Sequence, residues 1–199
     1  EMGLSPAMLK AVEDLGYQTP TPVQEQTIPV LLAQPNDIVA FAQTGTGKTA
    51  AYGLPVIQQV ESTSPLTQAL VLCPTRELCM QITNDLISFA KYQPGTQVVP
   101  VYGGASIQEQ IKKLDKGAQV VVATPGRAVD LINRRKLKLN HIQWLILDEA
   151  DEMLSMGFKD DLDAILSGTP ETRQTMLFSA TMPAEMVAIA NKYMVDPIE

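Results

Sequence analysis

Residues 42–49 are Ala42-Gln43-Thr44-Gly45-Thr46-Gly47-Lys48-Thr49. Glycines let a backbone turn tightly enough for several N–H groups to converge on phosphate oxygens. An apolar run before the stretch predicts a buried strand, and residues 49–60 after it suit a helix, whose N-terminus favours an anion. Lys48 is then placed to reach the β- and γ-phosphates, and the Thr49 hydroxyl to bind Mg²⁺. The stretch predicts a phosphate-binding loop for a nucleoside triphosphate.

One departure from the strict pattern G-x-x-x-x-G-K-[ST] is visible, because Ala42 stands where that pattern has its first glycine. The competing interpretation is a Gly/Thr-rich turn that happens to carry a lysine. The flanking strand and helix favour the phosphate loop, since they are the context that this loop requires.

The rest of the chain alternates between short apolar runs and longer amphipathic segments. Strands are expected at residues 37–41, 69–73, 98–101, 120–123, 144–147 and 175–178. Helices are expected near residues 50–60, 77–92, 106–116, 126–134, 159–166 and 184–193, and two more open the chain, after Ser5-Pro6 and from Thr21-Pro22 toward Ala33. The alternation predicts an α/β fold, a doubly wound and mostly parallel sheet with helices on both faces and functional loops at the carboxyl ends of the strands.

Composition narrows the class of protein. With 199 residues and 45% hydrophobic content, the chain suits one large domain. A net charge of −7 argues against binding nucleic acid through bulk charge, so any contact with a polyanion must be local. Two cysteines and one histidine support neither a disulfide framework nor a zinc site, and free thiols suit a reducing cytoplasm.

Targeting signals are also absent from the sequence. No apolar stretch approaches the roughly 18 residues that span a bilayer, and the first residues lack the order of a signal peptide. We therefore expect a cytoplasmic protein that does not bind membranes. The chain begins without methionine, at Glu1, and stops at Glu199 where another extended segment could begin, so we expect a larger parent protein.

A second strong pattern is the apolar run Leu145-Ile146-Leu147 followed by the acids Asp148 and Glu149. In enzymes with a phosphate loop, an aspartate at a strand end helps to hold Mg²⁺, which is the role expected of Asp148. Glu149 beside it is placed to orient the water that attacks the γ-phosphate. The alternative is that acids simply favour the first turn of a following helix. That alternative does not explain why the pair ends the most apolar strand.

These patterns together resemble one known family, the DEAD-box RNA helicases. The run Asp148-Glu149-Ala150-Asp151 spells the family's name. Further stretches resemble its motifs in the family's order: Gly16-Tyr17-Gln18-Thr19-Pro20-Thr21-Pro22-Val23-Gln24, Pro74-Thr75-Arg76-Glu77-Leu78, Gly103-Gly104, Thr124-Pro125-Gly126-Arg127 and Ser179-Ala180-Thr181. The resemblance covers nearly the whole chain and implies the N-terminal RecA-like domain of a bacterial type of RNA helicase, with ATP and Mg²⁺ as cofactors.

The resemblance also assigns a nucleotide site. It implies catalytic roles for Glu149, Lys48 and Asp148, a metal at Thr49 and Asp148, and nucleotide contacts from Tyr17, Gln18, Gln24, Ala42, Gln43, Thr44, Gly45, Thr46, Gly47, Lys48 and Thr49. In the family, the glutamine that matches Gln24 recognises the edge of the adenine base. An amide suits that role because it can donate one hydrogen bond and accept another. Thr21-x-x-Gln24 equally fits a capping box that closes a helix end, and the two roles can coexist.

Three strand-end loops resemble the family's RNA-backbone motifs. Threonine hydroxyls, N–H groups and guanidinium groups at Thr75-Arg76 and Thr124-Arg127 suit phosphate contacts, and the Gly103-Gly104 pair allows close backbone approach. The RNA-binding residues implied are Pro74, Thr75, Arg76, Gly103, Gly104, Thr124, Pro125, Gly126 and Arg127. Such contacts hold the RNA backbone without reading its sequence. The alternative for each arginine is an ordinary solvated side chain on the surface, without a role in RNA binding.

A further group is implied to couple hydrolysis to strand separation: Asp151, Ser179, Ala180 and Thr181. Ser179 and Thr181 could equally cap the helix that follows. The basic run over residues 134–138 is either an extra RNA patch or, as we favour, a solvated helix end, since cations suit helix C-termini. His141 is expected to be structural.

The stretch Gly16–Gln24 resembles the segment called the Q motif in the family. The expected organisation places N-terminal helices with this Q motif at residues 1–34, packed on an ATP-binding RecA-like domain at residues 35–199. The family's second RecA-like domain is not in these residues, so we expect the chain alone to be weakly active or inactive. The expected function is ATP-dependent unwinding or remodelling of short RNA duplexes. Two alternatives stay open at this point, an ATP-gated RNA clamp with incidental turnover and a small-molecule kinase with an unrelated phosphate loop.

Overall fold

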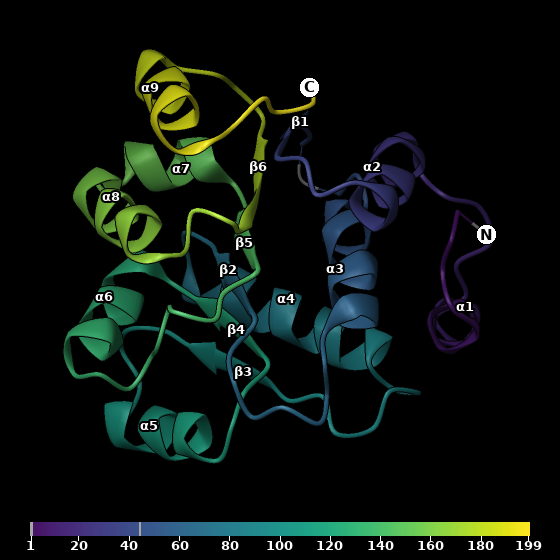
Figure 1. The fold of residues 1–199 in the computed structure, drawn as a ribbon, viewed down its shortest axis with the longest axis horizontal. Coiled ribbons are helices and arrows are strands. Elements are labelled where there is room, and N and C mark those ends of the chain that lie inside the picture. Colours follow the sequence, from purple (N-terminus) through teal and green to yellow (C-terminus); the bar gives the residue numbers. More distant parts are fainter. Residues whose placement is uncertain (1, 44) are drawn as a thin grey trace.

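A parallel β-sheet lies at the centre of the molecule (Figure 1). The computed structural model describes residues 2–43 and 45–199, and within them six strands pair in the order β1-β6-β5-β2-β4-β3. In chain order the strands are β1 (Ile38–Phe41), β2 (Ala69–Leu72), β3 (Val98–Val101), β4 (Val120–Ala123), β5 (Trp144–Leu147) and β6 (Gln174–Ser179). Every neighbouring pair is parallel, which confirms the predicted sheet.

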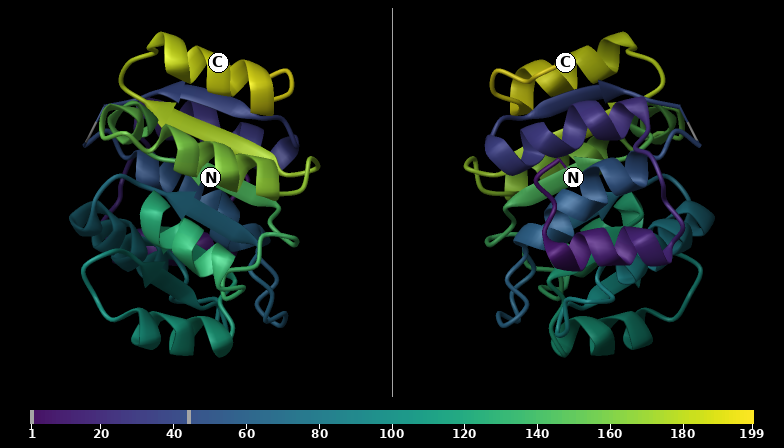
Figure 2. Two further views of the ribbon diagram at one scale, coloured as in Figure 1. Left: turned by 90° about the vertical axis from the view of Figure 1, so that its left-hand side faces the viewer. Right: turned by 90° about the vertical axis from the view of Figure 1, so that its right-hand side faces the viewer.

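Helices cover both faces of this sheet. They are α1 (Pro6–Asp14), α2 (Pro22–Ala33), α3 (Lys48–Gln59), α4 (Arg76–Phe89), α5 (Ile107–Asp115), α6 (Pro125–Asn133), α7 (Ala150–Ser155), α8 (Lys159–Gly168) and α9 (Ala184–Tyr193). Helices α1 to α4 lie on one face and α5 to α9 on the other (Figures 1 and 2). The fold is therefore the doubly wound α/β arrangement that right-handed crossovers produce.

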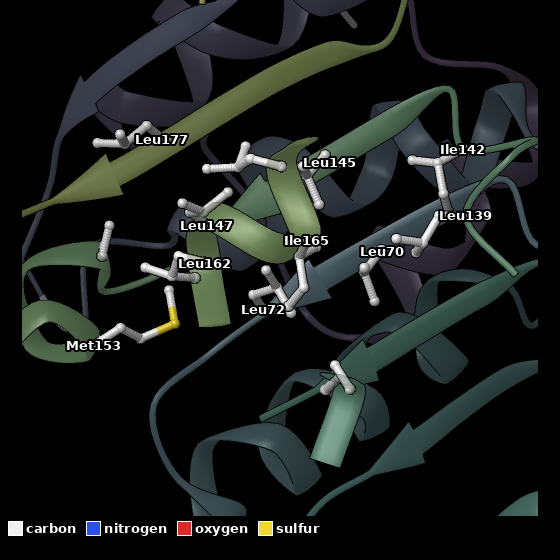
Figure 3. Close-up of a cluster of buried hydrophobic side chains, with 14 of the residues drawn as sticks. Leu70, Leu72, Leu139, Ile142, Leu145, Leu147, Met153, Leu162, Ile165 and Leu177 are labelled. Carbon is white, nitrogen blue, oxygen red and sulfur yellow. The ribbon is translucent and has the colours of Figure 1, made fainter. Parts of the chain in front are cut away.

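The strands form where they do because their side chains are apolar on both faces, as in a sheet covered from both sides. Along β5, Leu145 and Leu147 join the core beneath α7 and α8, whereas Ile146 points to the core beneath α3 and α4. Figure 3 shows the first of these cores, in which leucines of β2, β5 and β6 meet Met153 of α7 and Ile165 of α8. The central strands are fully buried, so the loops at their carboxyl ends start from fixed points.

One helix was not predicted. The predicted strands differ from the observed ones by no more than one residue at either end, but α7 was absent from the predicted elements. This helix is six residues long and opens with Asp151 and Glu152, acids that suit the N-terminal end of a helix dipole. It begins directly after Glu149, so the acidic run is both a strand end and a helix start.

The N-terminal helices pack against the face that carries α3. Helix α2 lies against α3, and α1 lies against α4 (Figure 2). Asp14, at the end of α1, accepts a 2.8 Å hydrogen bond from the Lys91 ammonium and another from the Tyr92 hydroxyl. The Q-motif segment is the chain between these two packed helices.

The last residues run beside the edge strand β1. Ile198 pairs in parallel with Ile38, and its backbone carbonyl accepts from the Val39 N–H at 2.9 Å. The buried carboxylate of Asp37 accepts from the backbone N–H groups of Thr175 and Val195 at 2.7 and 2.8 Å, which ties β1 to β6 and to the C-terminal segment. The strand that leads into the phosphate loop is thus anchored on both sides.

Two further predictions concern the thiols and membranes. Cys73 and Cys79 are free and buried, as predicted. A hydrogen bond with Cys79, together with burial, raises the pKa of the Cys73 thiol far above its usual range, so it stays protonated. Among the residues described, no helix combines the length and apolarity needed to cross a membrane.

Candidate functional site

The strand order divides the carboxyl edge of the sheet into two halves. Residues 42–43 and 45–49 follow β1 and lead into α3, residues 180–181 follow Ser179 at the end of β6, and residues 148–149 follow β5. These three strands are neighbours. The loops after β2, β4 and β3 carry residues 74–76, 124–127 and 103–104, and these strands are neighbours too. The described residues of the phosphate loop, with Asp148 and Glu149, therefore lie on one half of this edge, and those predicted to bind RNA backbone lie on the adjacent half.

The loop after β1 turns into α3 through Gly47. Gly47 has a φ of 80°, and a Cβ added there would lie 2.5 Å from the Gln24 amide nitrogen, so no other residue fits without a shift. The Thr46 hydroxyl donates to the Gln43 carbonyl at 2.7 Å within the turn. Thr44, also predicted to bind nucleotide, lies outside the described residues. The N-terminus of α3 has no side-chain cap, which leaves it to interact with an anion.

Lys48, at the start of α3, and Asp148, directly after β5, form a buried ion pair. The Lys48 ammonium lies 2.8 Å from Asp148 Oδ1 and 3.6 Å from Glu149 Oε1. Lys48 is buried and Asp148 is completely so. Burial raises the pKa of the Asp148 carboxyl above its usual value, against the opposing effects of the Lys48 ammonium and the Tyr52 hydroxyl. The structure brings together the three residues predicted to be catalytic.

Tyr52 is a fourth member of this cluster that the sequence analysis missed. Its hydroxyl donates to Asp148 Oδ2 at 2.8 Å. Burial, followed by the charge of Asp148, raises the pKa of Tyr52 well above its usual value, so the phenol stays a hydrogen-bond donor. A signal existed in the sequence, because Tyr52 follows Lys48 by four residues on a predicted helix and so shares its face.

Glu149 has an unusual backbone. Its φ of 52° and ψ of 50° place it in the left-handed region, a backbone conformation that residues other than glycine and asparagine rarely adopt. Such conformations persist where surrounding structure enforces them and are frequent at functional sites. In this conformation the chain turns from β5 into α7, and Glu149 Oε1 lies 3.6 Å from the Lys48 ammonium.

Gln24 links the Q-motif segment to the phosphate loop. Its amide nitrogen donates to the Gly47 carbonyl at 3.1 Å, and its amide oxygen accepts from the Thr21 N–H at 3.0 Å. The second contact is half of a capping box at the start of α2, so the helix-capping interpretation is confirmed. Gln24 also lines a hollow of about 130 Å³ together with Tyr17 and Gln18. The three predicted Q-motif residues thus meet at one place beside α3.

On the other half of the edge, two arginines are held by the protein itself. The Arg76 guanidinium lies 4.9 Å from the centre of the Tyr102 ring, which precedes Gly103. The Arg127 guanidinium donates to Gln110 Oε1 at 2.7 Å and to the Ala105 carbonyl at 3.2 and 3.3 Å. Each arginine therefore bridges from its own loop to the Gly103-Gly104 loop.

Gln110 completes this network. It is a buried side chain of α5, and its amide nitrogen donates to the Tyr102 carbonyl at 3.1 Å. It therefore contacts both the residue on which Arg76 rests and the guanidinium of Arg127. Gln110 could not be predicted from the sequence, because an isolated glutamine in an amphipathic helix looks like any surface residue.

The two threonines of these loops differ. Thr75 caps α4, and its hydroxyl accepts from the Leu78 N–H at 3.2 Å. Thr124 occupies the same position before α6 without a side-chain cap bond, and Pro125 begins that helix. The Thr124 side chain is thus not used to close its helix.

The loop after β6 is tied to α7 through Asp151. Asp151 Oδ2 accepts from the Thr181 N–H at 3.1 Å and from the Thr181 hydroxyl at 2.8 Å. The Ser179 hydroxyl donates to the Thr181 carbonyl at 2.6 Å, across Ala180. The structure therefore joins the four residues predicted to couple hydrolysis to strand separation. The alternative of capping is not observed, since the N-cap of α9 is Pro183.

The basic run at residues 134–138 stays apart from both halves. Arg134 pairs with Asp130 at 2.9 Å, and Lys136 lies 3.5 Å from Asp115, all on the exposed surface. The run begins at the C-cap of α6, as expected of a solvated helix end.

Comparison with known proteins identifies the family. The profile of the DEAD/DEAH box helicases matches residues 21–189. The chain belongs to this family. It is 51% identical over 197 residues to the ATP-dependent RNA helicase CshA of Limosilactobacillus reuteri, which covers 99% of the chain and 39% of that relative. It is 48% identical over 199 residues to the ATP-dependent RNA helicase DeaD of Mycobacterium tuberculosis, covering 100% of the chain and 35% of that relative.

The fold agrees with that membership. A crystal structure of a DEAD box protein from Methanococcus jannaschii superimposes with a TM-score of 0.95 at 43% identity, over 100% of this chain and 54% of the other. The RecA-like fold predicted for this DEAD-box chain is thus confirmed. The chain spans well under half of the curated relatives it matches, 39% of the first and 35% of the second.

Proposed function

We propose that this chain is the ATP-binding half of an ATP-dependent RNA helicase that hydrolyses ATP to remodel or unwind short RNA duplexes. The observation that carries the proposal is the buried Lys48–Asp148 pair with Glu149 beside it. The Lys48 ammonium lies 2.8 Å from Asp148 Oδ1 and 3.6 Å from Glu149 Oε1. Its position next to an uncapped helix N-terminus is the arrangement that phosphoryl transfer from a nucleoside triphosphate requires. Membership of a family of helicases supports the same conclusion.

A magnesium ion fits the residues at this point. Within the described residues, no group of three or more His, Cys, Asp or Glu side chains gathers around one position. Mg²⁺ does not need such a group, since it is usually held by one or two carboxylates together with substrate phosphates and water. Among the described residues, Asp148 Oδ1 has no partner other than the Lys48 ammonium at 2.8 Å. Asp148 and Thr49 would hold the cation, which would neutralise developing negative charge on the phosphates.

The remaining chemistry falls to three side chains. Lys48 binds the β- and γ-phosphates and in doing so leaves Asp148. Glu149 accepts a hydrogen bond from the attacking water and orients it in line with the bond to be broken. Gln24, with its amide already at the Gly47 carbonyl, reads the adenine edge in the hollow it shares with Tyr17 and Gln18.

RNA binds across the loops after β2, β4 and β3. These loops offer hydroxyl, N–H and guanidinium donors to sugar and phosphate, so binding does not depend on the RNA sequence. The residues concerned are Pro74, Thr75, Arg76, Gly103, Gly104, Thr124, Pro125, Gly126 and Arg127. Asp151, Ser179, Ala180 and Thr181 transmit the state of the nucleotide to the rest of the enzyme. Because these loops are local, an acidic protein can use them without a basic surface.

The wider protein is part of the same proposal. We assign residues 1–34 to a Q-motif segment and residues 35–199 to the ATP-binding domain, with a second RecA-like domain as the partner that completes the site. A cytoplasmic location suits free thiols and an RNA substrate. The chain alone should bind ATP weakly and hydrolyse it barely, because part of the transition-state stabilisation comes from that partner.

The test is RNA-stimulated ATP hydrolysis by the full-length gene product that contains this chain. We expect ATP turnover to depend on RNA, and Glu149→Gln to keep ATP binding while holding the RNA-bound state. Loss of ATP binding in Glu149→Gln would give Glu149 a structural role instead. Tight RNA binding without turnover in the wild type would support an ATP-gated clamp. A GTP affinity equal to that for ATP would contradict the role of Gln24.

A further inference from the structure

Tyr52 and Lys48 divide one carboxylate between them. The Tyr52 hydroxyl donates to Asp148 Oδ2, and the Lys48 ammonium lies at Oδ1, both at 2.8 Å. The two donors stand four residues apart on α3 and so share one helix face. Asp148 comes from β5, 96 residues further along the chain. The helix that begins at the phosphate loop thus holds the Asp148 carboxylate at both of its oxygens.

The two donors differ in their freedom to move. Lys48 has a four-carbon stem and an ammonium group that follows a nearby phosphate. Tyr52 is fully buried in the core between α3 and the sheet, and its ring lies 5.2 Å from the ring of Phe178, tilted by 50°. Its oxygen is therefore fixed by the packing of the ring. Only one of the two contacts with Asp148 can move to a ligand without repacking the core.

This difference matters when a nucleotide binds. As Lys48 moves from Oδ1 to the phosphates, that oxygen becomes open, while Oδ2 stays bonded to Tyr52. The carboxylate then keeps its orientation with one oxygen presented to a cation. Thr49, the other residue expected at the cation, lies one helical turn before Tyr52 on the same face.

We propose that Tyr52 is a positioning residue that fixes the Asp148 carboxylate for Mg²⁺ once Lys48 has moved to the phosphates. The inference rests on the proposed function, because it requires that ATP and Mg²⁺ bind here. It adds a residue that acts through Asp148 and contacts no ligand itself. Side chains that orient a metal ligand in this manner typically change metal affinity by about tenfold or more when they are removed.

The experiment compares ATP binding by the full-length gene product that contains this chain and by its Tyr52→Phe variant, in excess Mg²⁺ and in EDTA, using isothermal titration calorimetry. Tyr52→Phe removes one oxygen and keeps the ring in the core. We expect its dissociation constant for ATP in Mg²⁺ to rise about tenfold, and its dissociation constant in EDTA to equal that of the wild type. A residue that merely stabilises the fold would not change the two conditions differently.

A matched control exists on the opposite face of the sheet. The Tyr193 hydroxyl donates to Asp163 Oδ1 at 2.9 Å, so Tyr193→Phe also removes a tyrosine–aspartate hydrogen bond. We expect Tyr193→Phe to leave ATP affinity unchanged in both conditions. In an Asp148→Asn background, Tyr52→Phe should have no further effect on the dependence on Mg²⁺, because the two side chains act as one unit.

The outcomes separate the two levels of the proposal. Absence of ATP binding by the wild type would overturn the proposed function and this inference with it. Normal binding by the wild type with equal affinities in Tyr52→Phe, or an equal loss in Mg²⁺ and EDTA, would overturn only the role of Tyr52. If Tyr52→Phe does not fold, a crystal structure of the wild type with Mg²⁺ and a non-hydrolysable ATP analogue decides. Tyr52 still on Asp148 with Lys48 on the phosphates supports the inference, and any other arrangement contradicts it.

Discussion

The two halves of the sheet edge hold their charges in opposite ways. After β1 and β5, Lys48 and Asp148 are buried and each is the other's main partner. After β2 and β4, Arg76 and Arg127 are held by an aromatic ring, a backbone carbonyl and an amide, none of which carries a charge. In the first half a ligand must replace an existing ion pair. In the second half uncharged groups already hold each arginine in place, so its full positive charge is available to an incoming phosphate.

The largest expected effect breaks the buried pair. Lys48→Ala should abolish measurable ATP binding and lower the free energy of unfolding by about 3 kcal/mol, because Asp148 is left buried without its cation. Urea denaturation followed by circular dichroism measures the second effect. Lys159→Ala is the matched control, since it breaks the exposed 2.9 Å pair of Lys159 with Asp163. An equal loss of stability in both variants would show that burial does not distinguish the pairs.

The next prediction releases an arginine in the other half. Gln110→Ala removes the 2.7 Å contact that orients Arg127, so the affinity for single-stranded RNA should fall about fivefold with no change in ATP affinity. Fluorescence anisotropy with a labelled oligonucleotide of mixed sequence measures this. Glu109→Gln, an exposed change on the same helix, should not weaken RNA binding. A loss of ATP binding in Gln110→Ala would mean that the two halves are not independent.

A smaller effect separates the two threonines of the second half. Thr75→Ala should lower the free energy of unfolding by about 1 kcal/mol, because it removes the cap of α4, whereas Thr124→Ala should change it little. Both should weaken RNA binding to a similar extent. Urea denaturation and anisotropy on the same samples test the pair, and equal stability losses would contradict the difference in capping.

The smallest effect concerns Asp151, a half-buried counterpart of the fully buried Asp148. Burial raises the pKa of Asp151, but hydrogen bonds from Thr181 and from the Glu152 N–H outweigh it and hold the pKa below the usual value. Because the folded pKa is lowered, this contribution to stability is present above the unfolded pKa and is lost as the pH falls through the folded one. Thr181→Val should therefore raise the pKa of Asp151 and reduce the loss of stability in acid. A carboxyl titration by NMR would detect the shift, and an unchanged pKa would show that Thr181 does not hold Asp151.

Much of this fold could be predicted from the sequence, because buried parallel strands are short continuous apolar runs and the residues after them carry the chemistry. The short helix α7 escaped prediction, since its acidic start was read as part of a site. The strand order could not be predicted either. Apolar runs do not indicate their neighbours, yet the order separates the loops of β5 and β2 into different halves.

The contacts of Tyr52 and Gln110 show a second limit. Tyr52 is an apolar-looking member of α3, and its partner lies 96 residues away. Gln110 on α5 contacts Arg127 on α6, which lies 17 residues further along the chain, beyond β4. Such contacts depend on how the helices pack on the sheet, which periodicity within one segment does not specify. The predicted residues are mostly those expected to touch ligands, whereas the missed ones hold other side chains in place.

The division of the edge can be tested most directly by NMR on the isotope-labelled chain. Backbone amide shifts would be recorded during separate titrations with ATP in Mg²⁺ and with single-stranded RNA. If the two halves bind different ligands, ATP should shift amides in the loops after β1, β6 and β5, and RNA should shift those after β2, β4 and β3. The same set of amides responding to both ligands would contradict this division.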